Sequence, residues 1–120
     1  MSTTIPTFDI DAMRAATDRD GVDALERYLA EDVVWTETDA RTPPSAPGVV
    51  RGRDAVLARL REAHDAGLVS RVGDGFAAGD RAAVAIICTY PTGGKVLGHA
   101  LLTLRDGLIA RWDAVQAWDE

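Results

Sequence analysis

The hydrophobic pattern of this 120-residue chain changes its period near Gly67, and this change constrains the fold more than any other feature. Before Gly67 apolar residues recur at helical spacing, whereas after it they alternate with polar ones. The second half divides into four expected strands, at 68–77, 81–90, 95–104 and 108–118. The segments between them are rich in Gly, Pro and Asp, which favour tight turns. Helices that precede an antiparallel meander predict an α+β fold with the helices on one face of the sheet.

Three helices are expected in the first half. The first begins near Ile10, and the second restarts after Asp20-Gly21, with Asp20 as its N-cap. The third runs from Asp54 to Ala66, because its apolar residues share one side and the glycine that follows ends it.

Two non-helical segments separate the second and third helices. Residues 33–36 are β-branched and aromatic, which favours a strand. Segment 41–50 holds three prolines, so it can be neither a helix nor a central strand. A long irregular loop of this kind is a natural lid or pocket rim.

Composition limits the classes of partner and cofactor. The hydrophobic fraction of 47% and charged fraction of 27% predict one globular domain over residues 1–120. The net charge of −6 and scattered basic residues argue against nucleic acid, and no apolar run is long enough for a membrane. Two distant histidines and one cysteine predict no metal or other cofactor. The single Cys88, in an apolar strand, and the absence of a visible signal peptide predict a structural thiol and a cytoplasmic location.

Strand pairing predicts which side chains share a face. If Thr89 pairs with Val96, the hairpin of the expected strands 81–90 and 95–104 carries small residues on one face and bulky residues on the other. Small side chains under helices leave volume for a ligand, unless large helix side chains fill it. The bulky face would be convex, and a homodimer would cover it. The expected pocket floor consists of Ala83, Ala85, Gly98 and Ala100.

The order of these elements resembles the cone-shaped fold of nuclear transport factor 2, ketosteroid isomerase, limonene epoxide hydrolase and the SnoaL-like polyketide cyclases. The segments that carry the resemblance are 30–35 (AEDVVW), 52–56 (GRDAV) and 106–116 (DGLIARWDAVQ). The last is similar to an ending, Gly-Lys-Ile-x-Glu-His-Trp-Asp-x-x-Gln, that is common in SnoaL-like proteins. The resemblance implies the fold but leaves the reaction open, because this superfamily includes enzymes and non-enzymes.

Few of the catalytic residues of these enzymes have a counterpart in this sequence. Glu37 stands where ketosteroid isomerases carry their general base, but their oxyanion partners fall at Ala15 or Ala16 and at Ala100. The Arg and Asp of limonene epoxide hydrolases fall at Ala83 and Ala85. The candidate residues that remain, with side chains expected to face the pocket, are Trp35, Glu37, Trp112 and Gln116.

Each of these four residues has a functional and a structural interpretation. Glu37 beside indole rings could act as a general base, or it could be a solvated strand-end glutamate. The two tryptophans could stack on a flat ligand, or they could pack in the core. Gln116 and an indole N–H could polarise a substrate oxygen, or Gln116 could bond to a neighbouring strand. Met13 is expected in the core at the mouth of the pocket, where it could contact the ligand.

His99 and Asp113 form a second candidate catalytic pair, since they lie on adjacent expected strands. Alternation places both on the bulky face unless a bulge reverses it. The alternative is an interface or a structural hydrogen bond.

The resemblance implies a small hydrophobic organic molecule as ligand. The leading hypothesis is a cofactor-independent acid–base enzyme, an isomerase, cyclase or aldol-type enzyme that acts on a carbonyl- or ring-bearing metabolite. The alternative is a non-catalytic dimeric ligand-binding or accessory module of the same fold. A third possibility is that the proline-rich loop collapses into the cavity and leaves no ligand site.

Overall fold

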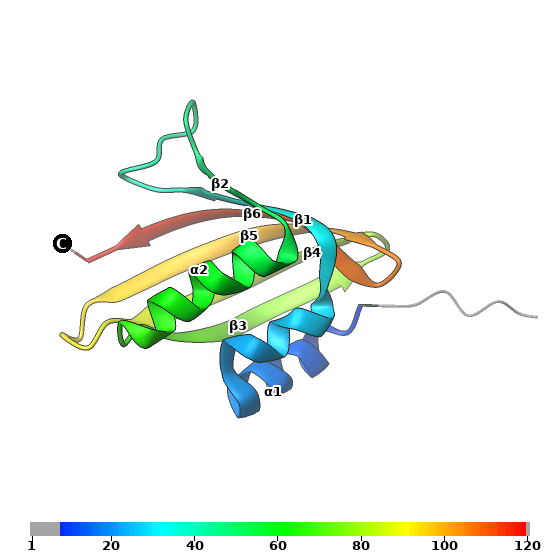
Figure 1. The fold of residues 1–120 in the computed structure, drawn as a ribbon, viewed down its shortest axis with the longest axis horizontal. Coiled ribbons are helices and arrows are strands. Elements are labelled where there is room, and N and C mark those ends of the chain that lie inside the picture. The colour runs from blue at the N-terminus through cyan, green and yellow to red at the C-terminus, as the bar shows by residue number, and fades with distance from the viewer. Residues whose placement is uncertain (1–7, 120) are drawn as a thin grey trace, which may run out of the picture.

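The computed structural model describes residues 8–119, and these form two α-helices, one 3₁₀ helix and a six-stranded sheet (Figure 1). The elements in chain order are α1 (Ile10–Asp20), η1 (Gly21–Tyr28), β1 (Leu29–Thr38), β2 (Gly48–Arg51), α2 (Arg53–Asp65), β3 (Val69–Ala78), β4 (Arg81–Thr89), β5 (Lys95–Arg105) and β6 (Leu108–Trp118).

The strands form one curved sheet in the order β2-β1-β6-β5-β4-β3. All neighbouring strands are antiparallel except β1 and β6, which run parallel with Trp35 beside Trp112. The helix α2 lies across one face of the sheet, and α1 packs against β3 on the same side (Figure 1). The predicted α+β class, with the helices on one face of the sheet, is therefore confirmed.

The prediction of three α-helices is wrong. The segment after the first helix, Gly21–Tyr28, is a 3₁₀ helix, so the described residues contain two α-helices. Asp20 makes no side-chain cap to this segment but ends α1, and Gly21 follows it at a φ of 77°. With no side-chain cap and a strand that begins at Leu29, the segment is short and takes the tighter helical form that is common in short pieces.

The proline-rich segment is shorter than expected. Its last three residues belong to β2 (Gly48–Arg51) at the edge of the sheet. Pro47 immediately precedes β2, which agrees with the confinement of proline to edges and strand starts. β1 is longer than the predicted 33–36, because pairing with β2 and β6 extends it from Leu29 to Thr38.

The predicted register of the β4–β5 hairpin is wrong by one residue. Thr89 pairs with Lys95 rather than with Val96. The N–H of Tyr90 donates to the carbonyl oxygen of Gly94, and Gly93 adopts a φ of 92° between them. A three-residue loop with a left-handed glycine is a common hairpin connection. The one-residue shift turns every side chain of β4 to the opposite face from the one predicted.

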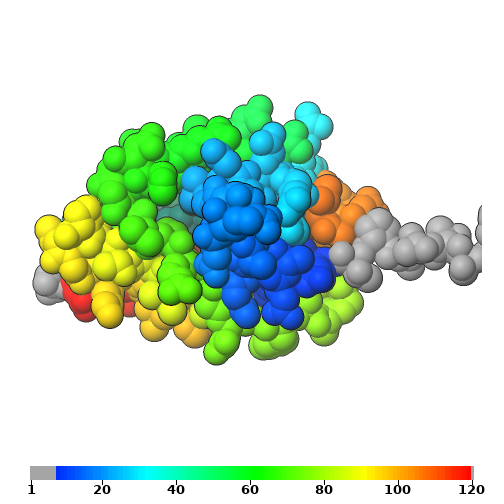
Figure 2. Space-filling view, turned by 90° about the horizontal axis from the view of Figure 1, so that it is seen from below, coloured from blue at the N-terminus to red at the C-terminus, as the bar shows by residue number. Residues whose placement is uncertain are grey.

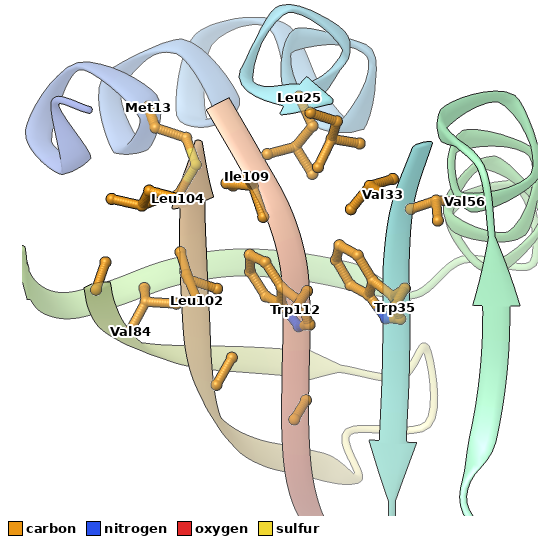
Figure 3. Packing of buried hydrophobic residues seen from close by; sticks show 14 of the residues in the cluster. Met13, Leu25, Val33, Trp35, Val56, Val84, Leu102, Leu104, Ile109 and Trp112 are labelled. Carbon is orange, nitrogen blue, oxygen red and sulfur yellow. The ribbon is translucent and has the colours of Figure 1, made fainter. Parts of the chain in front are cut away.

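The corrected register divides the helix-covered face into two parts. Towards α1 and η1 the face is a solid hydrophobic core, in which Met13, Leu102 and Ile109 are fully buried. Figure 3 shows Met13 reaching from α1 towards Leu104 and Ile109, whereas Val33 lies near Val56. The same face is not filled by core side chains beside the first residues of β5 and the last residues of β6. The cavity lies there.

Candidate functional site

A cavity of about 400 Å³ lies between the helices and the sheet, within the range of small-molecule sites. Figure 2 shows the surface hollowed between α2 (green) and α1 (blue). The walls are largely apolar. The apolar lining is Val22, Leu25, Trp35, Leu60, Ala63, Leu68, Val72, Ile86, Val96, Gly98, Trp112, Ala114 and Trp118. The pocket predicted from the sequence was also expected on this helix-covered face.

Glu37 is the central polar residue of the cavity. The indole Nε1 of Trp35 donates to Oε1 of Glu37 at 2.9 Å, and Nε2 of Gln116 donates to Oε2 at 2.9 Å. The guanidinium of Arg59 lies 4.0 Å from Oε2. Each carboxylate oxygen therefore accepts one hydrogen bond from a neutral donor, which orients the group and leaves further lone pairs free.

The two tryptophans stack on each other. Their ring centroids are 4.2 Å apart, the ring planes differ by 4°, and both side chains are nearly buried. The parallel pairing of β1 with β6 sets this contact, because it places Trp35 directly beside Trp112 (Figure 3). The faces turned to each other are closed to a ligand, so the stack serves as a rigid wall that holds the donor of Trp35 against Glu37.

Asp39 is a polar cavity residue that the sequence interpretation missed. It follows Glu37 by two residues, so strand alternation could have indicated it. Burial favours a higher pKa for Asp39, but hydrogen bonds from the backbone N–H of Arg41 and from Thr42 outweigh burial and lower the pKa. The Gln116 amide also contributes to this lowering, so it lies between two carboxylates.

Cys88 and Ser70 line the opposite wall, and their Sγ and Oγ atoms are 3.3 Å apart. Burial raises the pKa of the Cys88 thiol above its ordinary value of 9.0, a hydrogen bond with Ser70 opposes the shift, and the charge of Glu37 adds to it. The thiol is therefore neutral at physiological pH. The predicted register had turned Cys88 to the outer face, so its place in the cavity was not foreseen.

Three arginines line the cavity: Arg41, Arg59 and Arg71. Arg41 places its guanidinium carbon 5.8 Å from the centroid of the Trp118 ring, a cation–π arrangement. Arg59 follows Val56 by three residues and precedes Ala63 by four, so helical periodicity could have placed it on the cavity side of α2.

Of the four residues expected to form the pocket floor, only Gly98 lines the cavity. Ala83 and Ala85 lie on the outer face, because the register of β4 is shifted. Ala100 lies on the helix-covered face but is buried in the solid core, and so is Met13, which is 0% exposed. Neither Ala100 nor Met13 lines the cavity.

His99 and Asp113 lie on the outer face, as alternation predicted, and do not form a pair. His99 is opposite Val115, whereas Asp113 is opposite Leu101. Asp113 accepts hydrogen bonds from Thr36 Oγ1 at 2.7 Å and from Nε of Arg111, so its contacts are structural. The cavity and this pair are on opposite sides of the sheet.

A curved sheet covered on one face by helices, with a lined cavity between them, defines the nuclear-transport-factor-2-like class of domains. The sequence matches the SnoaL-like domain family over residues 10–112, and the chain belongs to that family.

Solved structures with the same fold come from several bacteria. A protein of unknown function from Mesorhizobium loti has 24% identity and a TM-score of 0.70, over 90% of this chain and 87% of that one. A protein from Kribbella flavida, provisionally named a ketosteroid isomerase, has 26% identity and a TM-score of 0.63, over 94% and 82%. A provisionally named isomerase from Rhodopseudomonas palustris has 19% identity and a TM-score of 0.61, over 87% and 82%. No curated protein matches the chain.

Proposed function

We propose that this chain is an enzyme that transfers a proton at a carbon next to a carbonyl group, without a cofactor, on a small hydrophobic metabolite. Isomerisation, cyclisation and aldol-type reactions all begin with this step. The observation that carries the proposal is the placement of Glu37, a carboxylate held by two neutral donors inside a largely apolar cavity. Relatives provisionally named isomerases agree with this reaction class.

In the proposed mechanism Glu37 is the general base. A carbon-bound proton of the substrate moves to a carboxylate oxygen, and the C–H electron pair shifts into the adjoining carbonyl as an enolate. In an isomerisation the same proton returns to a different carbon, so the reaction is redox-neutral. Trp35 and Gln116 hold the carboxylate so that a free lone pair points into the cavity.

This arrangement changes the roles that the sequence suggested for Trp35 and Gln116. Gln116 and an indole N–H were expected to polarise a substrate oxygen, but in this structure Gln116 and the indole of Trp35 donate to Glu37. We therefore assign them as positioning residues. The apolar walls supply the binding of the hydrophobic part of the substrate.

The first experiment tests Glu37 with carbon acids in deuterated water. Benzylacetone and a β,γ-unsaturated cyclohexenone serve as probes, and NMR measures deuterium incorporation and double-bond migration. Glu37→Gln should lower the catalysed rate by about 100-fold or more, since it removes the base. The Gln116 amide can rotate to present its oxygen to the new amide, so the fold should be retained.

Glu31→Gln is the matched control, because Glu31 is an exposed glutamate on the same strand. This variant should catalyse deuterium incorporation into the probes at the wild-type rate. Equal rates for Glu37→Gln and the wild type would contradict the enzyme proposal.

One observation favours the alternative of a non-catalytic ligand-binding module. The donors nearest to Glu37 are bonded to carboxylates, and the positions of the isomerase oxyanion partners are alanines. A binding module would bind the same ketones, protect Cys88 from alkylation and exchange no deuterium.

We also propose that the outer face of the sheet binds a second copy of the chain. Its exposed apolar residues lie on neighbouring strands and form one patch: Phe76 (70% exposed), Val115 (64%), Leu101 (59%), Leu97 (52%) and Ile87 (44%). Such a patch is unusually apolar for a monomer, and an isologous dimer would remove it from water.

A further inference from the structure

Ser70 and Cys88 face the cavity from the strands opposite Glu37. Ser70 of β3 pairs with Cys88 of β4, and partners across two strands share a face of the sheet. Cys88 is 8% exposed and both residues line the cavity, so the face that they share is the inner one. Their Oγ and Sγ atoms are 3.3 Å apart, and Ser70 itself is exposed, so a ligand can reach its hydroxyl.

The hydroxyl of Ser70 differs from those of Thr17 and Thr42, which also line the cavity, in what it bonds to. Both threonine hydroxyls donate to backbone carbonyl oxygens, at 3.0 and 3.2 Å. Ser70 instead contacts a thiol, which can donate a hydrogen bond as well as accept one. Burial raises the pKa of Cys88, so the thiol keeps its proton and can donate it in a hydrogen bond to Oγ of Ser70. The O–H of Ser70 can then donate to a ligand.

The floor of the cavity separates Ser70 from Glu37. Glu37 is bonded to Gln116 of β6. Ser70 contacts Cys88 of β4, and β5 lies between β4 and β6. Two strand spacings are about 10 Å, a length that a small ring-bearing ketone can span. Gly98 of β5 lines the cavity here and has no side chain to fill the gap. The charge of Glu37 also raises the pKa of the Cys88 thiol, so the two groups act on each other across the cavity.

The proposed reaction needs a hydrogen-bond donor that the neighbours of Glu37 do not supply. When a carbon-bound proton moves to Glu37, negative charge develops on the substrate oxygen. The N–H groups of Trp35 and Gln116 that lie closest are bonded to Glu37 itself. A donor on the other side of the ligand would stabilise the developing charge.

We propose that the hydroxyl of Ser70 donates a hydrogen bond to the carbonyl oxygen of the substrate and stabilises the enolate that forms when Glu37 takes the proton. Cys88 is a positioning residue, because its S–H donates to Ser70 and leaves the serine hydrogen for the ligand. No covalent bond forms or breaks at Ser70. The inference rests on the proposed function, since it places the substrate in the same cavity with its reacting carbon at Glu37.

Isomerisation of the β,γ-unsaturated cyclohexenone measures the contribution of Ser70. Ser70→Ala should lower kcat about tenfold or more and change KM much less, because the hydrogen bond strengthens as charge develops. Ser70→Thr keeps the hydroxyl and should retain most of the activity. Ser45→Ala is the matched control, since Ser45 is an exposed serine outside the cavity, and it should react at the wild-type rate.

Isothermal titration calorimetry tests the same hydrogen bond without turnover. The ligand 4-phenylbutanamide has a carbonyl oxygen, whereas butylbenzene has a similar shape and no oxygen. Ser70→Ala should bind the amide about fivefold more weakly than the wild type and should bind butylbenzene with unchanged affinity. A general change in the shape of the cavity would weaken both ligands alike and would overturn the inference.

Two further results would contradict the role of Ser70 alone. One is a wild-type kcat in Ser70→Ala while Glu37→Gln loses activity. The other is a larger loss of kcat in Tyr90→Phe than in Ser70→Ala, since Tyr90 also lines the cavity and is 47% exposed. If Glu37→Gln keeps the wild-type rate, the enzyme proposal fails, whereas a selective loss of amide binding in Ser70→Ala would still place the ligand oxygen at Ser70.

Discussion

Single residues determine the chemistry of the cavity, and two of them could be found from the sequence. Strand alternation around the two tryptophans predicted Glu37 and Gln116 on the pocket-facing side, and both line the cavity. Their hydrogen bond joins residues 79 positions apart, which local spacing does not predict. Arg59 and Asp39 carried a periodic signal but resemble ordinary surface residues until the cavity is known.

Cys88 gives a prediction about pH. Burial raises the pKa of its thiol in the folded state, so above the ordinary value of 9.0 the unfolded chain loses this proton while the folded chain keeps it. The free energy of unfolding should therefore fall as pH rises through that value towards the higher folded pKa. Urea unfolding of the wild type and of Cys88→Ser, followed from neutral to alkaline pH, measures the difference between the two chains.

Cys88→Ser should lose less stability over the alkaline range than the wild type, since only this titration is removed. Parallel pH profiles for the two chains would contradict the assignment. Because Cys88 is the only cysteine, its slow reaction with iodoacetamide at neutral pH also reports occupancy of the cavity.

Elements were predicted well where local signals agree and less well where tertiary pairing decides. The stop of α2 before Gly67 and the four late strands follow from periodicity and turn residues. The form of Gly21–Tyr28 does not, because its apolar residues fit either a 3₁₀ helix or an α-helix. The β4–β5 register depends on whether Tyr90 is opposite Gly94 or opposite Lys95, and composition alone does not distinguish these.

Gly98 of β5 tests whether the cavity is the ligand site. A Cβ atom there would lie 3.6 Å from Cβ of Gln116 and 3.8 Å from Cβ of Ile86, which are ordinary contacts. Gly98→Val should therefore fold, with unchanged or slightly raised stability, because glycine in a strand interior costs about 0.5–1 kcal/mol. Its branches would occupy the cavity and should weaken binding of 4-phenylbutanamide about tenfold or more in calorimetry.

Ala117→Val is the control for Gly98→Val, since Ala117 is exposed and opposite Leu97 on the outer face. This variant places the same valine side chain on the outer face, away from the cavity, and should bind the amide like the wild type. Unchanged binding by Gly98→Val would show that the ligand lies elsewhere.

At the scale of the whole molecule, the sheet separates two candidate sites. Its inner face holds the core and the cavity, and its outer face holds the apolar patch together with His99 and Asp113. In residues 8–119 no helix is long and apolar enough to cross a membrane. An exposed apolar patch on neighbouring strands is typical of surfaces that associate with other proteins, and a second copy is the partner proposed above.

Leu101→Glu tests the homodimer. Leu101 is 59% exposed on the outer face, opposite Asp113, so a second negative charge there would repel an isologous partner. Sedimentation velocity should give about twice the 12.8 kDa chain mass for the wild type and the chain mass for the variant. Ala58→Glu, which adds the same charge on an exposed position of α2, should remain a dimer, and a monomeric wild type would contradict the proposal.

The sequence by itself determined the class of the fold, the order of its strands along the chain and the inward residues of β5 and β6. These properties depend on local periodicity, which each segment carries within itself. The tertiary structure decided which face β4 presents, where the core ends and the cavity begins, and that Ser70 and Cys88 meet on the cavity wall. These depend on pairings between distant segments, and here a one-residue difference in the β4–β5 pairing sets the face of a whole strand.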